Sequence, residues 1–198
     1  MADKLKILLA EDEASVAASL VKQLRGLGHE VVGEAATGEQ AVRLAEETGP
    51  DVVVMDIKMP DGDGIDAARR IAEHSPIPVL FLSGHFDEEL LHGVAESGGL
   101  AYLLKPATSE QLQAALTLAR KRFGEMEDLR AQVSRLEQAL ETRKLVSRAK
   151  GLLMDRQGLT EEDAHRRMQK EASRLSIKLV DLARAILAAG EFVGGAEQ

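Results

Sequence analysis

Residues 52–64 read VVVMDIKMPDGDG, and this segment indicates the kind of fold. Its first four residues, Val52–Met55, form an apolar run of strand length, and Asp56 follows them directly. The proline and glycines behind Asp56 are typical of a turn. A short apolar run bounded by turn residues indicates a buried strand of a parallel sheet. The stretch therefore predicts a strand whose carboxyl end carries a carboxylate.

The residues on either side repeat this alternation of short apolar runs and helical patterns. The apolar runs are Ile7–Ala10, Val31–Val32, Val52–Met55, Val79–Leu82 and Ala101–Leu104, and the helical patterns are Ala14–Leu27, Glu39–Glu47, Ile65–Glu73, Glu88–Glu96 and one from about Ser109. Five strands alternating with five helices predict an α/β domain over residues 4–120, a doubly wound five-stranded parallel sheet covered on both faces. Val31–Val32 ends in a plain loop, as an edge strand would. Thr108 and Gln111 offer a capping box for the fifth helix.

Unusual polar residues follow four of the five strands. Glu11 and Asp12 come after the first strand and Asp56 after the third. Ser83 follows the fourth strand and Lys105 the fifth. Each residue alone has an ordinary explanation, such as a helix cap, a turn or a loop. Together they predict one site, because ligands of open parallel sheets bind at the carboxyl ends of the strands.

The residue types of this site point to phosphoryl chemistry. Clustered carboxylates repel one another and need a cation, and oxygen ligands without cysteine or histidine fit Mg²⁺. With Mg²⁺ bound, the carboxylate of Asp56 could attack a phosphoryl group and form an aspartyl phosphate. Lys105 would offset the charge of the phosphate, and Ser83 would donate a hydrogen bond to a phosphoryl oxygen.

Four motifs resemble the receiver domain of two-component response regulators. They are LLAEDE at residues 8–13, MDIKMPDGDG at 55–64, LSG at 82–84 and AYLLKP at 101–106. The resemblance covers residues 4–120 and implies a flavodoxin-like fold. It also implies a sensor histidine kinase as the phosphoryl donor. Such a domain is not an enzyme beyond its own phosphotransfer and autodephosphorylation.

The same resemblance implies a role for each matching residue. Asp56 would be the phosphoacceptor, and Glu11 and Asp12 would hold Mg²⁺ with it. The remaining protein ligand of the metal would be the backbone carbonyl of Lys58. Two further implications are that Ser83 and Tyr102 form a switch pair and that the Lys105–Pro106 peptide bond is cis.

The composition excludes several classes of protein. The chain has 198 residues, with 25 Lys and Arg against 33 Asp and Glu, and a formal net charge of −8. Cysteine is absent, which excludes disulfides, thiolate metal sites and a cysteine nucleophile. No apolar run approaches the roughly 18 residues of a membrane span, and the one near the N-terminus is too short for a secretory signal. We therefore expect a cytoplasmic protein.

The charge is distributed unevenly along the chain. Residues 1–120 hold 10 basic and 20 acidic residues, whereas residues 142–184 hold 11 basic and 6 acidic residues. An acidic first part and a locally basic second part suggest two functions, although charge on helix surfaces also serves solubility.

A continuous helix is predicted from about residue 109 to residue 157, since no proline follows Pro106. Within it, apolar residues alternate spacings of three and four at Met126, Leu129, Val133, Leu136 and Leu140. This a/d pattern predicts a coiled-coil linker over residues 121–140. It fits a homodimer seam through residues 126–140 and a single amphipathic helix packed on its own chain equally well.

The last segment, residues 141–190, is predicted to form a three-helix unit. Its first helix should end at Gly158, and Thr160 and Ser176 are candidates to cap the second and third helices. Two apolar stripes indicate a core: Ala164, Met168 and Ala172, then Leu179, Ala183 and Ile186. Gly151 lies inside the first helix, where glycine costs about 1 kcal/mol against alanine. A close helix crossing would explain it.

This segment resembles the ANTAR domain of RNA-binding antitermination regulators. The resemblance rests on ETRKLVSRAKGLLM at residues 141–154 and GLTEEDA at 158–164, and it continues to about Leu187. It implies binding to paired hexaloop hairpins in nascent RNA, which blocks a terminator. Where the family often has an aromatic residue, this chain has His165, which is expected to be a buried or surface histidine.

Residues 142–184 contain no Phe, Tyr or Trp, so loop bases cannot stack on such rings there. Recognition must then rest on phosphate contacts, arginine planes and hydrogen bonds to splayed bases. The candidate RNA contacts are Arg143, Arg148, Lys150, Arg166, Arg167 and Lys178. The family match favours Lys150 among them.

These observations predict a response regulator in which phosphorylation of Asp56 controls RNA binding and transcription antitermination. The main alternative is a DNA-binding response regulator, because the last two helices could form a helix-turn-helix and charge does not separate RNA from DNA. A phosphohydrolase with the same carboxylates is disfavoured, because Lys58 stands where a second acid would follow Asp56. The chain also lacks a glycine-rich loop ending in Gly-Lys-Ser/Thr.

Overall fold

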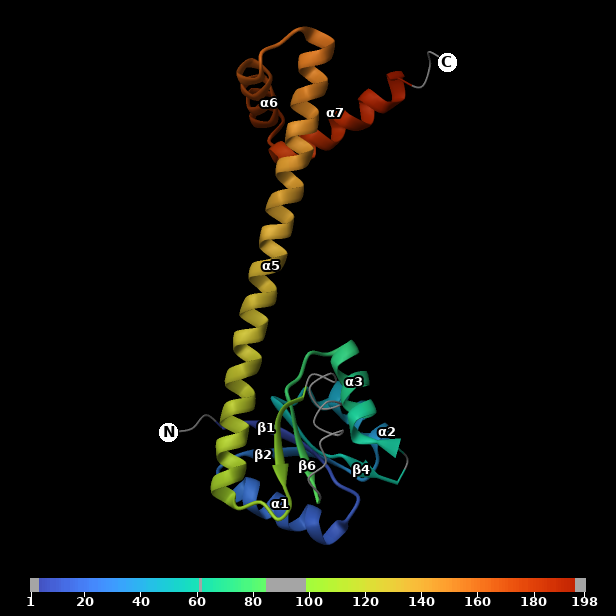
Figure 1. Ribbon diagram of the computed structural model, residues 1–198, viewed down its shortest axis with the longest axis vertical. Coiled ribbons are helices and arrows are strands. Elements are labelled where there is room, and N and C mark those ends of the chain that lie inside the picture. The colour runs from blue at the N-terminus through green and yellow to red at the C-terminus, as the bar shows by residue number, and fades with distance from the viewer. Residues whose placement is uncertain (1–3, 61, 85–98, 195–198) are drawn as a thin grey trace. The chain divides into compact units, whose positions relative to one another are not determined.

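The computed structural model describes residues 4–60, 62–84 and 99–194. The chain divides into two compact units, with the division between Glu127 and Asp128. The N-terminal unit is an α/β domain and the C-terminal unit is helical (Figure 1).

The N-terminal unit is built on a five-stranded parallel sheet with the order β2-β1-β3-β6-β7. Its strands are β1 (Lys6–Ala10), β2 (Glu30–Ala35), β3 (Val52–Asp56), β6 (Val79–Ser83) and β7 (Gly99–Leu104). All neighbouring strands run parallel. The five predicted strands are confirmed, and β2 lies at the edge as its plain loop suggested.

Helices cover both faces of this sheet. The helices α1 (Ala14–Gly26) and the first part of α5 (Ser109–Gln157) pack on one face, and α2 (Gly38–Thr48) and α3 (Gly64–His74) pack on the other (Figure 1). The side chains of β3 alternate between the two resulting cores, as a pleated strand requires. The predicted doubly wound fold is therefore confirmed. The helix predicted at Glu88–Glu96 lies outside the described residues.

A short hairpin after the central strand was not predicted. It pairs β4 (Lys58–Met59) with β5 (Gly62–Asp63) in antiparallel fashion and leads directly into α3. The proline and glycines of this stretch had indicated a turn, without paired strands on either side of it. The hairpin closes because the backbone N–H of Gly64 returns to donate to the carbonyl of Ile57 at 2.8 Å.

The predicted capping box begins α5. The hydroxyl of Thr108 accepts from the backbone N–H of Gln111 at 3.3 Å, and the side-chain oxygen of Gln111 accepts from the backbone N–H of Thr108 at 2.9 Å. The helix then continues for 49 residues. It passes residues 120 and 140 without a break. The domain boundaries expected at these two positions stay predictions.

The a/d residues of α5 form an exposed apolar stripe. Exposed fractions are 61% for Leu129, 65% for Leu136 and 58% for Leu140. These side chains are not covered by the described residues of the same chain.

The C-terminal unit packs the end of α5 with α6 (Glu161–Leu175) and α7 (Leu179–Gly194). Its buried core consists of Ala149, Met168, Ala172, Leu182 and Ala183. The hydroxyl of Thr160 accepts from the backbone N–H of Asp163 at 3.2 Å, which confirms the cap predicted for α6.

Two expectations for this unit were wrong. Ser176 does not cap α7, because it ends α6 in the left-handed conformation with φ 54°. Lys178 stands before α7 instead, and its carbonyl accepts from the backbone N–H of Leu182 at 3.2 Å. Gly151 marks no close helix crossing, since a Cβ there would meet no atom within 4 Å.

Gly64→Ala should destabilise the N-terminal unit. A Cβ at this position would overlap the backbone carbonyl oxygen of Asp56 and lie 3.2 Å from Cα of Ile57. Backbone atoms cannot swing aside as a flexible side chain can, so we expect a loss of about 1–3 kcal/mol. Urea unfolding followed by the fluorescence of Tyr102, the single tyrosine, measures this unit.

The matched control is Gly124→Ala within α5, where a Cβ would meet nothing within 4 Å. That substitution should stabilise the helix by up to about 1 kcal/mol. Equal urea midpoints for Gly64→Ala and the wild type would contradict the steric argument.

Candidate functional site

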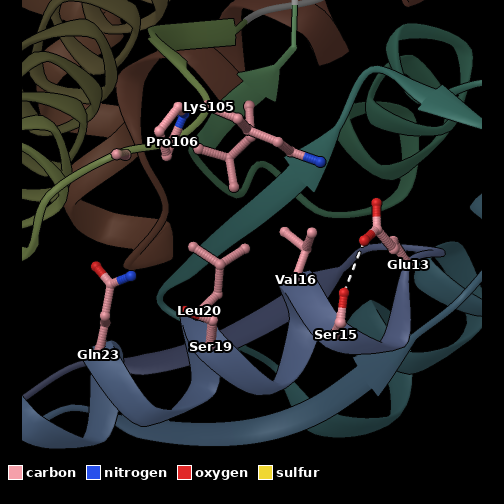
Figure 2. Close-up of a pocket in the computed structure, with 10 residues that line it drawn as sticks. Glu13, Ser15, Val16, Ser19, Leu20, Gln23, Lys105 and Pro106 are labelled. Carbon is pink, nitrogen blue, oxygen red and sulfur yellow. Dashed lines mark hydrogen bonds between the residues drawn. The ribbon is translucent and has the colours of Figure 1, made fainter.

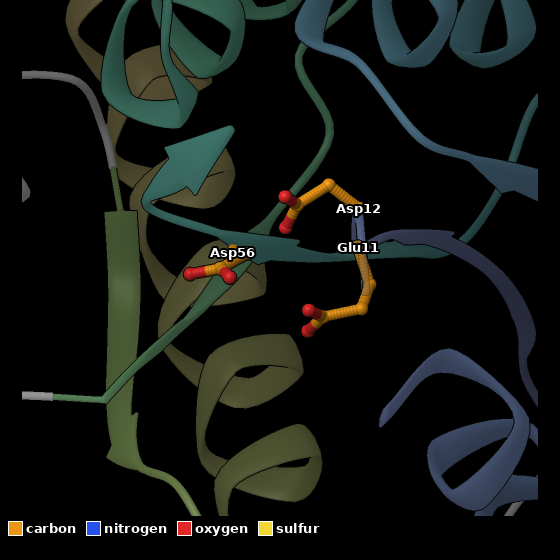
Figure 3. A group of neighbouring side chains, drawn as sticks. All are labelled: Glu11, Asp12 and Asp56. Atoms are coloured by element: carbon orange, nitrogen blue, oxygen red, sulfur yellow. The ribbon is translucent and has the colours of Figure 1, made fainter. Parts of the chain in front are cut away.

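Three carboxylates converge at the carboxyl edge of the sheet. Glu11 and Asp12 follow β1, and Asp56 ends β3, its neighbour in the sheet. One carboxylate oxygen from each of the three lies within 4.8 Å of the others. Figure 3 shows the three side chains beside one another at this edge. Glu11 and Asp56 are buried, whereas Asp12 is exposed. The parallel register thus brings together residues that are 45 positions apart.

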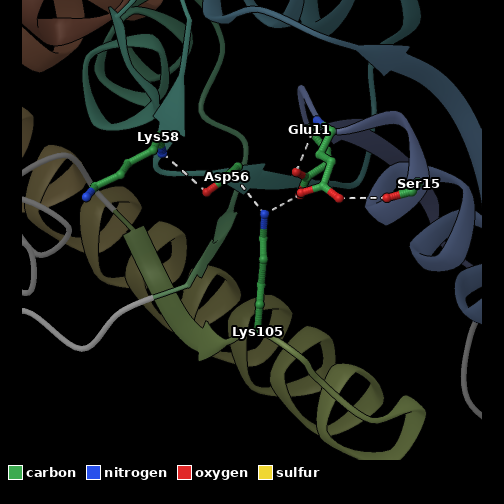
Figure 4. A network of polar contacts seen from close by, with 6 residues as sticks. Glu11, Ser15, Asp56, Lys58 and Lys105 are labelled. Carbon is green, nitrogen blue, oxygen red and sulfur yellow. Dashed lines mark hydrogen bonds and ion pairs between the residues drawn. The ribbon is translucent and has the colours of Figure 1, made fainter.

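Lys105 joins two of these carboxylates. Its Nζ lies 2.5 Å from Oε2 of Glu11 and 2.6 Å from Oδ2 of Asp56. Figure 4 marks both contacts with dashed lines. The lysine follows β7, and its backbone N–H donates to the carbonyl of Ser83 at 2.8 Å. The Lys105–Pro106 bond is cis, as the resemblance implied.

Burial and pairing set the charges in this cluster. Burial raises the pKa of the Glu11 carboxyl, and the hydrogen bond and attraction from Lys105 offset this only in part. Burial lowers the pKa of Lys105, but its hydrogen bonds to Asp56 and Glu11 outweigh that effect and leave the pKa raised. Lys105 is therefore an ammonium ion at neutral pH. One ammonium does not neutralise three carboxylates, so a negative charge remains.

The cluster fits a magnesium ion. Its donors are carboxylate oxygens, and the exposed side of Asp12 leaves room for the waters that Mg²⁺ keeps. The residual negative charge supplies the attraction. The backbone N–H of Lys58 donates to Oδ1 of Asp56 at 3.2 Å, which fixes the orientation of that carboxylate. The carbonyl of Lys58 as a further ligand stays a prediction.

The two expected switch residues lie on neighbouring strands. Ser83 ends β6 and is buried. Tyr102 lies on β7 opposite Phe81 and packs partly buried against the core on the α2–α3 face. Their coupling to phosphorylation stays a prediction.

A hollow of about 400 Å³ opens beside Lys105, between α1 and the connection from β7 to α5 (Figure 2). Val16, Leu20 and Pro106 give it apolar walls, and Ser15 and Gln23 stand among its polar residues. The hollow shares Lys105 with the acidic cluster but none of the three carboxylates. It therefore offers a contact surface beside the acidic site.

Comparison with known families adds to this geometry. The response regulator receiver domain matches residues 7–117, and the ANTAR domain matches residues 134–187. The chain belongs to the receiver–ANTAR response regulators. Both resemblances in the sequence are thereby confirmed, and the acidic cluster lies in the receiver domain.

Two transcriptional regulatory proteins match this chain over different lengths. The transcriptional regulatory protein PdtaR from two strains of Mycobacterium tuberculosis is 46% identical over 167 residues, which cover 84% of this chain and 82% of that protein. The transcriptional regulatory protein LiaR from Bacillus subtilis (strain 168) is 35% identical over 119 residues, 59% of this chain and 56% of that protein.

Solved structures resemble the receiver. The receiver domain of a modulated diguanylate cyclase from Desulfovibrio desulfuricans G20 has a TM-score of 0.59 and 30% identity, with 63% of this chain and 99% of that chain covered. A LuxR-family response regulator from Aurantimonas sp. SI85-9A1 has a TM-score of 0.55 and 31% identity, with 58% and 84% covered.

The candidate RNA contacts of the ANTAR domain fall into two groups. Three have intramolecular partners: Lys150 with Glu161 at 2.5 Å, Arg166 with Glu162 at 2.6 Å, and Arg167 with Gln157 at 2.8 Å. The other three, Arg143, Arg148 and Lys178, are exposed and form no ion pair with the described residues. No pattern in the sequence indicates the Lys150–Glu161 pair, because its members lie 11 residues apart on different helices.

Among the described residues, no helix combines the length and apolar character needed to cross a membrane.

Glu11→Gln should change stability in opposite directions with and without Mg²⁺. Because its pKa is raised in the folded receiver, Glu11 favours folding at low pH and loses that contribution as the pH rises through the raised value. The neutral amide avoids this loss, so the variant should resist urea better than the wild type at neutral pH in EDTA. Millimolar Mg²⁺ should reverse the order, because the wild type alone keeps the ligand.

Urea midpoints from the fluorescence of Tyr102 in both buffers test this prediction. Glu13→Gln is the control, since Glu13 is exposed and lies outside the acidic group. It should leave the response to Mg²⁺ unchanged. A wild type more stable than Glu11→Gln in EDTA at neutral pH would contradict the assignment.

Proposed function

We propose that a sensor histidine kinase phosphorylates Asp56 and that this controls binding of the ANTAR domain to RNA hairpins, giving transcription antitermination. The observation that carries the proposal is the Lys105 ammonium held between Glu11 and Asp56 in a chain whose last part matches the ANTAR family. A cation already held beside the acceptor carboxylate can stabilise the negative charge that a phosphoryl group brings to the site.

The chemistry follows from the placement of these groups. A carboxylate oxygen of Asp56 attacks the phosphorus of a phosphohistidine; the O–P bond forms while the P–N bond breaks, and the histidine nitrogen keeps the electron pair. Lys105 then exchanges the Asp56 oxygen for a phosphoryl oxygen, to which Ser83 donates a hydrogen bond. Bound by Glu11, Asp12, Asp56 and the Lys58 carbonyl, Mg²⁺ would supply neutralisation of charge on the phosphoryl group.

The output is assigned to RNA because the ANTAR family implies it, and the basic surface is compatible with it. Arg143, Arg148 and Lys178 are exposed cations available for phosphate contacts. PdtaR, which shares most of this chain's length, is named as a transcriptional regulatory protein.

Assembly through α5 is part of the proposal. The exposed stripe of Leu129, Val133, Leu136 and Leu140 would pair with the same stripe of a second copy. A seam of little more than two heptads is weak alone, so a modest bias from phosphorylation could switch it. Sedimentation of the protein with and without beryllofluoride measures this. A monomer in both states at tens of micromolar would contradict the seam.

Acetyl phosphate with Mg²⁺ should add one acid-labile phosphoryl group to the chain. Asp56→Asn should accept none, because an amide is not a nucleophile at neutral pH. Asp12→Ala should raise the Mg²⁺ concentration required, because it removes a ligand charge. Intact-mass measurement at neutral and acid pH follows the reaction. Asp51→Asn serves as a control for acidic residues outside the site, and normal phosphorylation of Asp56→Asn would reject the acceptor.

Phosphorylated protein should bind hairpin RNA more tightly than duplex DNA of equal charge at matched salt. The reason is that single-stranded loops present base edges that a duplex hides. Gel shifts with both nucleic acids, on wild type and Asp56→Asn, separate the alternatives. Tighter binding to the duplex would favour the DNA-binding regulator. Equal RNA binding before and after phosphorylation would remove the regulatory link.

A further inference from the structure

Lys150, the favoured RNA contact, is not a free cation. Its Nζ lies 2.5 Å from Oε1 of Glu161, and its side chain is only 18% exposed, whereas that of Glu161 is 71% exposed. The hydrogen bond and charge of Lys150 lower the pKa of the Glu161 carboxyl, which therefore stays ionised at neutral pH. The ammonium thus presents its charge together with a carboxylate that neutralises it.

The pair forms part of a surface hollow of about 390 Å³. Lys150, Glu161, Glu162 and His165 line it, from the end of α5 and the start of α6. His165 is half-buried, and its Nδ1 is buried without a hydrogen-bond partner among the described residues. The next residue along α5, Gly151, leaves open space where a Cβ would stand. The hollow therefore has a polar lining that intramolecular contacts do not fully satisfy.

This lining suits a nucleobase better than a phosphate. An entering phosphate would meet the carboxylates of Glu161 and Glu162 and would have to displace Glu161 from Lys150. A base is neutral, and its Watson–Crick edge places a hydrogen-bond acceptor beside a donor. A donor ammonium next to an acceptor carboxylate complements that edge. His165 adds a half-buried polar side chain to the same lining.

We propose that this hollow binds the Watson–Crick edge of one unpaired RNA loop base, with Lys150 Nζ donating to the base and Glu161 accepting from it. The inference rests on the proposed RNA-binding function and assigns base reading, rather than a phosphate contact, to Lys150. The two roles differ measurably. A phosphate contact on single-stranded nucleic acid contributes about 0.7 to the slope of log K against log salt, whereas a lysine already paired with a carboxylate releases no counterion.

The probe is an RNA with two stem-loops and randomised six-nucleotide loops, selected for binding to the phosphorylated full-length protein. The selected RNA and versions with one loop base replaced at a time are then titrated over a salt series. Lys150→Ala and Glu161→Gln test the hollow. Lys178→Ala is the matched control, since Lys178 is an exposed lysine of the same domain with no ion pair to a described residue.

We expect one loop position at which the wild type discriminates about tenfold or more, as base contacts commonly do. Lys150→Ala and Glu161→Gln should both lose that discrimination at the same position, and Lys150→Ala should keep the salt slope. Lys178→Ala should weaken binding to all loops alike. Because Glu161 is mostly exposed, Glu161→Gln decides the question if circular dichroism shows that Lys150→Ala is misfolded.

Three results would overturn the inference while leaving RNA binding in place. Lys150→Ala could flatten the slope by about 0.7 and keep the discrimination, which makes Lys150 a phosphate contact. Glu161→Gln could tighten binding to every loop, which would mean that Glu161 competes with an RNA phosphate for Lys150. Both variants could match the wild type. If selection enriches no RNA at all, the proposed function fails and the inference fails with it.

Discussion

The Lys105 ammonium between Glu11 and Asp56 is the interaction on which the receiver depends. Two carboxylates withdrawn from water at one sheet edge carry a large desolvation cost, and Lys105 is the basic side chain that the structure places between them. Lys105 lies 94 residues beyond Glu11 in the chain. The pair forms only when β1, β3, β6 and β7 are all in the sheet in the observed order. The site therefore requires the complete sheet, because a different strand order would leave the carboxylates without their counter-ion.

Each domain pairs a lysine with carboxylates, but the two arrangements favour different ligands. In the receiver, Lys105 pairs with two of three clustered carboxylates, so the cluster stays negative and favours a cation, after which a phosphoryl group can enter. In the ANTAR domain, Lys150 faces Glu161 in a pair without net charge, which favours a neutral ligand with both a donor and an acceptor. The number of carboxylates around each lysine therefore decides which ligand it can receive.

The surroundings of Asp56 show how closely the backbone is built around the acceptor. Gly64 starts α3 against the carbonyl of Asp56, and the N–H of Lys58 holds the carboxylate from the other end of the same turn. Both contacts arise within eight residues of Asp56. The stretch that predicted the strand therefore also contains the residues that orient its terminal side chain.

The amino-acid sequence alone was enough to predict the alternation of strands and helices, the capping box at Thr108, the cap at Thr160 and the set of polar residues at the strand ends. These features are local, since a period or a cap is complete within a few residues. Predictions from local sequence were wrong at two positions. Ser176 ends α6 instead of capping α7, and no helix crosses closely at Gly151. The folded structure was needed to show which carboxylates Lys105 joins and that Lys150 is paired with Glu161. Those contacts depend on which elements pack side by side, and no spacing along the chain records that choice.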